Sequence, residues 1–420
     1  MPIPSTGFKD TADTGFKDTA DTGFITEKRF DVSSWFQVQL ENNVSEPVRK
    51  FSIGTSEYTD RVTKWPTIKR TINELKSLKI NVQLDNTDGH FNGFYANVYT
   101  IPNTCTLQVG FNHPTSGDEL VTLYTGYLES VKYEKREVCG VTLVDNLKDF
   151  EKRKIGESSN PVSFAAQIPS DIAWTLCTCY GGKSNVQSTN NPDIDYTSFL
   201  AWSSVLSANA TECQAYYDGQ KIIESLNDLA KITDSGIWVE GNGKINFLKY
   251  GEISSLDFTY TADYFQNLEI EVEKQRLVNK AYVNFDYSVE SGYFTKTVFG
   301  INSDSINSYG LQEEIYENKN IWHVSSVSAL DFANRKVQLY FEPPRRFILD
   351  IDLYAMRQNL GETVKLEDTF YGITVADGWR LSEQQFNLDN GQMVLELDSA
   401  IVAEAFYLDV SSLDGEERLL

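Results

Sequence analysis

The sequence predicts an α+β protein that is mainly β. Three observations support this class. Aromatic residues make up 13% of the 420 residues, and aromatic and β-branched side chains favour strands. Many short segments alternate apolar and polar residues and end at turn sequences, as strands do. The central part of the chain instead carries apolar residues at helical spacing, which predicts an inserted domain of helices and a hairpin.

The composition predicts a chain that buries a full core and does not bind nucleic acid by sequence. Hydrophobic residues account for 41%, and the 26 glycines bring the apolar share to that of average globular chains. The chain has 60 acidic and 37 basic residues, a formal net charge of −23. A surface this acidic repels phosphate. Because no long apolar run and no signal-peptide pattern occurs, we expect no membrane-spanning segment and no secretion by a signal peptide.

Cysteine and histidine usage gives little support to thiol, imidazole or metal chemistry. The five cysteines are scattered and odd in number, which fits a chain that folds in a reducing cytoplasm. Cys177 and Cys179 are two residues apart, roughly 200° around a helix, and cannot share one metal ion. We expect Cys177 to be a small core residue. Three histidines are few for imidazole catalysis or a multi-histidine site.

The first 24 residues repeat an octapeptide. TGFKDTAD occupies 6–13 and again 14–21, and a third copy begins at Thr22. Each copy holds one Phe and no strand-like alternation, so it cannot bury a core of its own. The copies are also too few for a solenoid. We therefore predict that residues 1–24 form a flexible or partner-ordered arm.

Residues 25–156 are predicted to form a first β domain. The turn sequence DNTDG at 85–89 supports this. A short helix is expected over 145–153, with Leu147 and Phe150 on its buried side. Alternation predicts strands over Trp35–Leu40, Lys79–Leu84, Thr104–Val109, Leu120–Leu128 and Val138–Val144.

Residues 157–250 are predicted to form the inserted α+β domain. One helix begins at Pro169 and ends at Gly181-Gly182. Its apolar face is expected to carry Ile172, Ala173, Leu176, Cys177 and Tyr180. A loop around Asn190 follows, and a second helix opens at Gly219-Gln220. A β-hairpin then turns at Gly241-Asn242-Gly243 between strands expected over Ile237–Glu240 and Lys244–Leu248.

Residues 251–404 are predicted to form a second β domain with one helix over 327–341. Pro343-Pro344 should end that helix. Its buried stripe is expected to consist of Val327, Leu330, Ala333, Val337 and Tyr340. Strands are expected over Leu268–Val272, Ala281–Tyr287, Tyr293–Phe299, Thr363–Leu366, Gln385–Leu388 and Met393–Leu397. Residues 405–420 are predicted to be an acidic C-terminal tail.

No short motif marks an active site. Hydrolase elbows, zinc-protease motifs and phosphate loops do not occur, and the turn at 85–89 lacks the register of a calcium loop. Asp193 and Asp195 lie two apart in a loop, where acidic residues are common. Arg345-Arg346 is a local basic spot that we expect to pair with acidic neighbours. We predict no catalytic, cofactor-binding or metal-binding residue, although a carboxylate pair assembled only by the fold stays open.

Four stretches in a characteristic order, spanning about residues 30–400, carry a family resemblance. They are GYLESV at 126–131 with VTLVDNLKDF at 141–150; the helix 169–182 with NPDIDY at 191–196 and Trp202; the helix from Gly219 with WVEGNGKI at 238–245; and DSINSYG at 304–310 with the Ala333 helix, Pro343-Pro344 and LGETV at 360–364. In this order the chain resembles the tail hub proteins of tailed bacteriophages, the tail-tip or baseplate hub family. Glu362 stands where these proteins usually have Asp, a change that keeps the charge.

The resemblance implies β-barrel-like domains of the tail-tube type and a structural, non-enzymatic role. Copies made in the host cytoplasm would form a homotrimeric ring at the virion tail tip. The implied partners are a tail tube or distal tail protein, tail fibre or spike proteins, and the tape-measure protein. Three copies would carry three times −23, or −69, so DNA could pass through the ring during ejection and host entry without specific binding.

Two other functions stay open. A tail-associated hydrolase that opens the cell envelope would depend on one Asp or Glu whose mutation stops sugar release. A receptor-binding tail module would instead bind host cells directly.

Overall fold

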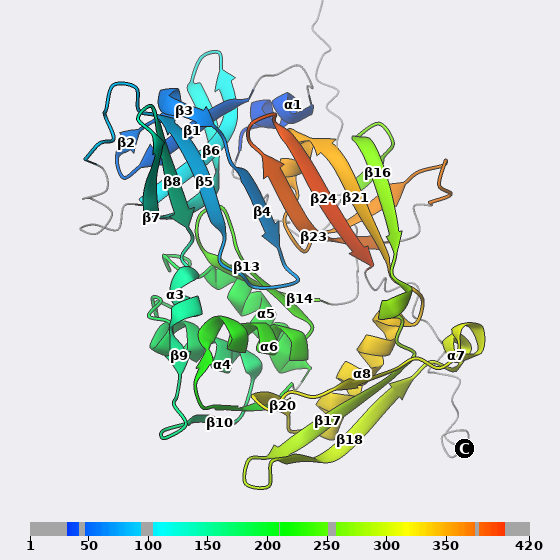
Figure 1. Ribbon diagram of the computed structural model, residues 1–420. Helices are drawn as coiled ribbons and strands as arrows, with labels where there is room; N and C mark the ends of the chain where they lie inside the picture. The colour runs from blue at the N-terminus through cyan, green and yellow to red at the C-terminus, as the bar shows by residue number, and fades with distance from the viewer. Residues whose placement is uncertain are drawn as a thin grey trace, which may run out of the picture.

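The computed structural model describes residues 32–41, 47–93, 104–209, 211–250, 258–373 and 378–399. The octapeptide arm and the acidic tail lie outside these residues. In Figure 1, two large sheets lie side by side, with a helical unit and a smaller sheet below them. The mainly β, α+β class expected from the sequence is confirmed.

The first sheet has seven strands, and every neighbouring pair is antiparallel. Its alternating sequences place one apolar row on the buried face, as Ile80, Val82 and Leu84 show. The expected strands from Lys79 onward are confirmed. In sheet order they are β2 (Ser56–Glu57), β1 (Val48–Ile53), β6 (Thr104–His113), β7 (Gly117–Lys135), β8 (Val138–Val144), β5 (Lys79–Asp85) and β3 (Val62–Lys64).

The second sheet also has seven strands but is less regular. Its edge strand β15 runs parallel to β22, whereas the other pairs are antiparallel. In sheet order the strands are β15 (Phe258–Thr261), β22 (Thr363–Glu367), β23 (Gly378–Asn387), β24 (Gln392–Ser399), β21 (Arg345–Asp352) and β16 (Phe265–Val272), with β4 (Thr67–Thr71) beside β23. The strands expected here are confirmed, although β23 begins at Gly378 rather than at the expected Gln385.

The two half-barrel sheets share one hydrophobic core. Leu107 and Val141 of the first sheet belong to the same buried cluster as Leu349 and Leu395 of the second. Strand β4 ties the two sheets further, because it comes from the N-terminal part yet pairs with β23 (Figure 1). Neither sheet therefore closes its core without the other.

The elements from α3 to β14, here called the middle unit, contain most of the helices. Its hairpin turn contacts both sheets: Thr125 donates to the Gly241 carbonyl oxygen at 2.8 Å, and Arg70 pairs with Glu240 at 2.6 Å. The two predicted helices and the hairpin are confirmed. The elements are α3 (Lys148–Lys152), β9 (Lys154–Ile155), β10 (Val162–Gln167), α4 (Pro169–Thr175), a π-helical turn (Leu176–Tyr180), α5 (Tyr196–Ala208), β11 (Cys213–Tyr217), β12 (Gln220–Lys221), α6 (Ile222–Ile232), β13 (Ser235–Val239) and β14 (Ile245–Lys249).

The elements from β17 to α8, here called the small unit, form a three-stranded sheet with one helix on it. The sheet order is β18-β17-β19, and β20 leaves the unit to pair with β11 of the middle unit. The elements are β17 (Lys280–Ser288), β18 (Tyr293–Ile301), α7 (Ser303–Tyr309), β19 (Glu313–Tyr316), β20 (Ile321–His323) and α8 (Ser326–Tyr340). The domain boundaries at 156 and 250 stay a proposal.

The strand expected over Trp35–Leu40 is wrong: Ser34–Glu41 is a helix, α1. The sequence alternates, but Phe36 and Leu40 are buried while Val38 between them is 50% exposed. This is the spacing of one helical face, not of one strand face. Ser33 selects the helix by accepting a hydrogen bond from the Phe36 amide at 3.1 Å, as a helix cap does.

Three further expectations on helices need correction. The second β region holds two helices rather than one, because Asn302 caps α7 through the Ser305 amide. Helix α5 follows the loop around Asn190 and was not expected. The buried stripe of α8 is also displaced, since Val327 and Leu330 are exposed while Ala329 and Phe332 are buried. The buried face runs through Ala329, Phe332, Ala333 and Val337, so Val327 and Leu330 lie to one side of it.

Candidate functional site

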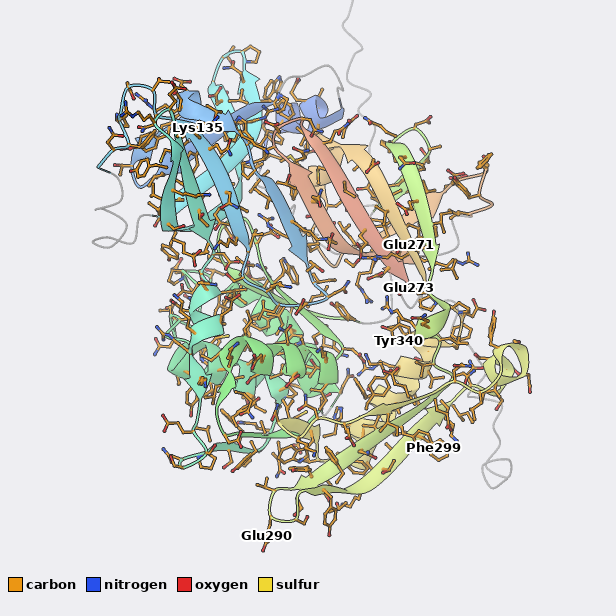
Figure 2. All side chains as sticks on the ribbon, viewed as in Figure 1. Lys135, Glu271, Glu273, Glu290, Phe299 and Tyr340 are labelled. Carbon is orange, nitrogen blue, oxygen red and sulfur yellow. The ribbon has the colours of Figure 1, made fainter. Side chains whose placement is uncertain are left out.

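The small sheet has one buried face and one open face. Ala281, Val283 and Phe285 point to α8 and are buried. On the other face, Tyr282 of β17 lies opposite Phe299 of β18 and Ile315 of β19, and paired residues project to the same side. Phe299, Ile301 and Ile315 are 51%, 50% and 62% exposed. We call Tyr282, Phe299, Ile301 and Ile315 the outer face; Figure 2 marks Phe299 on it.

Polar contacts fix the outer face in place. Lys280 pairs with Glu313 at 3.1 Å and lies over the Tyr282 ring, with Nζ 4.8 Å from its centroid. The Tyr282 hydroxyl donates to Glu313 at 3.1 Å. The hydrogen bond from Lys280 keeps the pKa of Glu313 below its ordinary value. The apolar side chains are therefore presented on an ordered surface with charges at its border, the usual anatomy of a protein contact.

A second exposed apolar feature is the loop between β22 and β23. Phe370 is 87% exposed and Tyr371 is 52% exposed. The Asp368 carboxylate accepts hydrogen bonds from the amides of both residues, at 2.8 and 3.1 Å. The loop therefore holds two aromatic side chains out in a fixed turn. We call Phe370 and Tyr371 the aromatic tip.

A buried ionic cluster joins the small unit to the middle unit. Asp234 follows α6 and has a left-handed backbone, with φ at 48°. Its carboxylate pairs with Lys336 at 2.6 Å and lies 3.7 Å from Nε of Arg335, both on α8. Burial raises the pKa of Asp234, but Lys336, Lys249 and Arg335 together keep it below its ordinary value. Since the three residues come from both units, the cluster fixes α8 against the end of α6.

Two more buried groups, Lys249 and His323, lie beside this ionic cluster, and we call the cluster and these two groups the joint. Burial lowers the pKa of Lys249 to about 7, and its ammonium donates to the Thr233 carbonyl oxygen. Burial also lowers the pKa of His323 to about 4, and its Nδ1 lies 2.6 Å from the Ser328 hydroxyl. Low dielectric surroundings strengthen each of these contacts. The arrangement therefore acts as a rigid connection between units.

The residues considered for metal chemistry from the sequence have local structural roles. Cys177 is fully buried in the core of the middle unit, as expected, and burial raises the pKa of its thiol to about 12. Cys179 is exposed. Across the parts of the chain that the structure describes, no three His, Cys, Asp or Glu side chains gather as a metal site would need.

The acidic turn and loop residues also bind nearby backbone. In the turn at 85–89, Asp85 accepts from the Thr87 amide at 3.0 Å. Asp193 accepts from the Ser184 amide at 2.8 Å, whereas Asp195 caps α5 through the Ser198 amide at 2.9 Å. Asp193 and Asp195 thus hold two different segments.

Within the basic pair at 345–346, Arg346 contacts acidic neighbours, as expected from the sequence. Arg346 pairs with Glu271 at 3.3 Å and with Glu396, on strands at either side of it. Partial burial lowers the pKa of the Arg346 guanidinium, but the hydrogen bonds that it donates to these carboxylates raise the pKa above its ordinary value. Figure 2 marks Glu271 at the end of the second sheet. Arg346 of β21 therefore links its strand to both neighbouring strands, β16 and β24.

No pattern in the sequence predicted the joint. Asp234 and Lys336 are about a hundred residues apart and belong to no motif. One signal was present: Lys336 follows Phe332 by four residues and Ala333 by three, so all three share the buried side of α8. A lysine within an apolar stripe calls for a buried acidic partner.

No helix among the described residues has the length and apolar character that a membrane crossing needs. No protein-family model matches the chain, and no curated protein matches its sequence.

Two solved structures share its architecture. The 43 kDa tail protein of prophage MuSo2 from Shewanella oneidensis is 14% identical, with a TM-score of 0.53 over 85% of this chain and 98% of that protein. A tail protein from Neisseria meningitidis MC58 is 12% identical, with a TM-score of 0.55 over 84% and 96%. The resemblance inferred from the order of sequence segments is thus confirmed at the level of fold: the chain has the fold of phage tail proteins.

Proposed function

We propose that this chain is a structural hub protein of a phage tail, which forms a homotrimeric ring at the distal end of the tail. The observation that carries the proposal is the pair of half-barrel sheets of seven strands in one chain. Three copies around an axis bring six such sheets together. A trimer built in this way matches a six-fold tube on one side and three-fold tip proteins on the other, so the ring joins tail tube to fibre or spike proteins.

Charge supports a channel for DNA and the tape-measure protein. Each copy carries a formal charge of −23. An acidic ring does not attract phosphate, so DNA moves through it during ejection without being held. The same charge makes copies repel one another, and assembly therefore depends on apolar contacts.

The outer face and the aromatic tip supply such contacts. Both present large apolar side chains that are exposed in the single chain but held by Glu313 and Asp368. Aromatic side chains fixed before binding are typical anchors of protein interfaces. We assign the aromatic tip, which projects from the second sheet, to the contact with the next copy in the ring.

Mass photometry of the purified full chain tests the ring. Three copies of 47.6 kDa, about 143 kDa in total, are expected, and Phe370→Ser should shift the population toward single chains. The exposed Val186 in the middle unit provides a control, because Val186→Ser should leave the trimer intact. A wild-type protein that remains monomeric at micromolar concentration contradicts the proposal.

A structural role also predicts that the protein releases no sugars from purified host envelopes. Sugar release that stops when one Asp or Glu is mutated would favour a tail-associated hydrolase instead. Binding of the isolated chain to whole host cells would favour a receptor-binding module.

A further inference from the structure

A cleft opens where the second sheet, the middle unit and the small unit meet. Its volume is about 350 Å³, within the range of small-molecule sites. Residues from all three parts line it, among them Arg380 of β23, Lys231 of α6 and Tyr340 of α8. Figure 2 marks Tyr340 and, close to it, Glu273 at the connection between the second sheet and the small unit.

The lining has more cationic than anionic groups. Lys231, Arg276, Lys336 and Arg380 face two carboxylates, those of Asp234 and Asp398. Both carboxylates already have partners: Asp234 pairs with Lys336 at 2.6 Å, and Asp398 accepts from the Asn73 amide group at 3.1 Å. Arg276 pairs with Glu273 at 2.8 Å, outside the lining. Because Asn73 is neutral, Asp398 keeps its charge, and it lies opposite Arg380 in the ladder of β23 and β24. Lys231 and Arg380 together therefore carry one positive charge more than this carboxylate balances.

Arg380 is the unusual member of this set. Its side chain is only 8% exposed, and its guanidinium carbon lies 4.1 Å from the centre of the Tyr250 ring. Within the described parts of the chain, no hydrogen bond or ion pair joins the guanidinium to another side chain. Burial lowers the pKa of the guanidinium, although the charges of Asp234 and Asp398 act in the opposite direction.

The geometry around Arg380 is fixed. The Tyr250 hydroxyl donates to the Ile72 carbonyl oxygen at 3.1 Å, which locks the ring on which the guanidinium rests. A guanidinium held in one plane presents its N–H donors as a fork, which matches the two oxygens of a carboxylate or phosphate. The exposed Lys231 lies at the rim of the same cleft and can approach the anion from the solvent side.

We propose that this cleft is an oxyanion site, in which Arg380 binds a carboxylate or phosphate group and Lys231 contributes from the rim. The proposal does not depend on the hub function. An anion in this position contacts residues of the second sheet and the middle unit at once, so its binding stiffens the junction. In a chain with a net charge of −23, a cleft lined by more cations than anions is a local exception that specific binding explains.

Thermal unfolding and calorimetric titration of the full chain test the site. Inorganic phosphate and citrate are the probes, each compared with sodium chloride at the same ionic strength. Either anion should raise Tm by several degrees beyond chloride, since a ligand that binds only the folded state stabilises it. Arg380→Gln should weaken binding at least tenfold and Lys231→Gln a few-fold. Lys64→Gln, which removes one exposed charge elsewhere, should change nothing.

Folding of the variants does not limit the test. Arg380→Gln removes a buried charge but no hydrogen bond to another side chain of the described residues, and Lys231→Gln changes an exposed side chain, so both should keep the wild-type circular dichroism spectrum. Arg380→Lys keeps the charge but loses the fork, and should bind more weakly than wild type and better than the Gln variant.

The same variants distinguish two sources of the anion. If a carboxylate of a neighbouring copy fills the cleft, Arg380→Gln also reduces self-association and citrate competes with it. If a free anion fills the cleft, self-association is unchanged. The proposal is overturned if neither phosphate nor citrate stabilises the wild-type protein beyond chloride, or if Arg380→Gln binds them as wild type does.

Discussion

The middle unit and the small unit combine helices and strands in similar ways but bury their apolar residues differently. The cluster that fills the middle unit has 24 buried hydrophobic residues, including Leu75 and Ile321 from outside the unit, whereas the cluster under α8 has eight. Helix α8 covers one side of the small sheet, and the outer face stays open. The middle unit is therefore stabilised by its own core. The small unit depends on its neighbours, through β20, the Asp234 cluster and whatever covers the outer face.

This contrast assigns different tasks to the two units. A large closed core keeps a unit rigid and sets its position between the two sheets. A small core with an exposed apolar face costs stability in the isolated chain and supplies area for assembly. Substitutions in the two units should therefore separate folding from assembly.

The largest loss of stability is expected from the core of the middle unit. Trp202 is 1% exposed, stacks on Phe247 with ring centres 5.0 Å apart, and donates to the Ser235 hydroxyl at 2.8 Å. Trp202→Ala leaves a large cavity and removes one hydrogen bond to the Ser235 hydroxyl, and should lower the free energy of unfolding by about 4 kcal/mol in a denaturant titration. Leu200→Ala on the same helix, where the side chain is 47% exposed, should cost under about 0.5 kcal/mol. Equal losses would remove the contrast between core and surface.

The joint between the units should give the next largest effect. Asp234→Asn keeps a side chain that tolerates the left-handed backbone but leaves buried Lys336 without its counter-charge. We expect a loss of about 3 kcal/mol, the usual result of breaking a buried ion pair. Hydrogen exchange should accelerate in α8 and β17 before it does in the middle unit.

Asp331 provides the matched control for the joint. It pairs with Arg335 at 2.7 Å but is 51% exposed, so Asp331→Asn should change stability by less than about 0.5 kcal/mol. If the Asp234 and Asp331 variants lose the same stability, burial does not decide the strength of the joint.

Much of the fold follows from sequence periodicity alone. Strand β8 has the bounds expected from its alternation, Val138–Val144, because turns at both ends and one buried face fix its register. Helices α4 and α6 were expected for the same reason: Pro169 and Gly181 mark the ends of one, and an apolar stripe marks the other. Local signals sufficed wherever a segment buries one face against its own domain.

Predictions from the sequence failed where tertiary packing determines the structure. The alternating segment Trp35–Leu40 became a helix because Phe36 packs on Phe111, with ring centres 5.2 Å apart, and Ser33 caps its start. The sequence does not distinguish the outer face from a buried sheet face, because Phe299 and Ile301 alternate with other residues in the same way as buried strand residues do. Neither the joint nor the cleft could be predicted from the sequence, because Asp234, Lys336 and Arg380 come together only in the folded chain.

The buried lysine of the joint gives a pH test with a defined sign. Burial lowers the pKa of Lys249 from its ordinary 10.5 to about 7. Between pH 7 and 9 the unfolded chain therefore keeps a proton that the folded chain releases, and stability rises with pH. We expect Lys249 to contribute a gain of up to about 2 kcal/mol between these pH values. Urea titrations at pH 7, 8 and 9 measure it.

Lys249→Met isolates this contribution. The variant should be at least as stable as wild type at pH 7 and should lack the rise, while Lys64→Met, an exposed substitution, should retain it. A wild-type protein whose stability is flat or falls over this range shows that Lys249 is charged in the folded state, and that the joint is more open to water than its burial indicates.

The smallest effect on stability is expected at the outer face, where the effect on assembly should be large. Phe299 is 51% exposed, so about half of its surface remains in water in the single chain and Phe299→Ser loses little burial on folding. The free energy of unfolding should fall by no more than about 0.5 kcal/mol.

If the outer face meets a partner or a further copy, covering the rest of the Phe299 ring contributes about 1.5 kcal/mol at the usual value per apolar area, roughly a tenfold change in affinity. Mass photometry across a dilution series, or pull-down by the neighbouring tail protein, measures that change, with Val186→Ser as the control for an exposed apolar residue of the middle unit. Unchanged assembly together with a large loss of stability would mean that Phe299 supports the small unit's own fold, and the difference between the two units would then be one of core size alone.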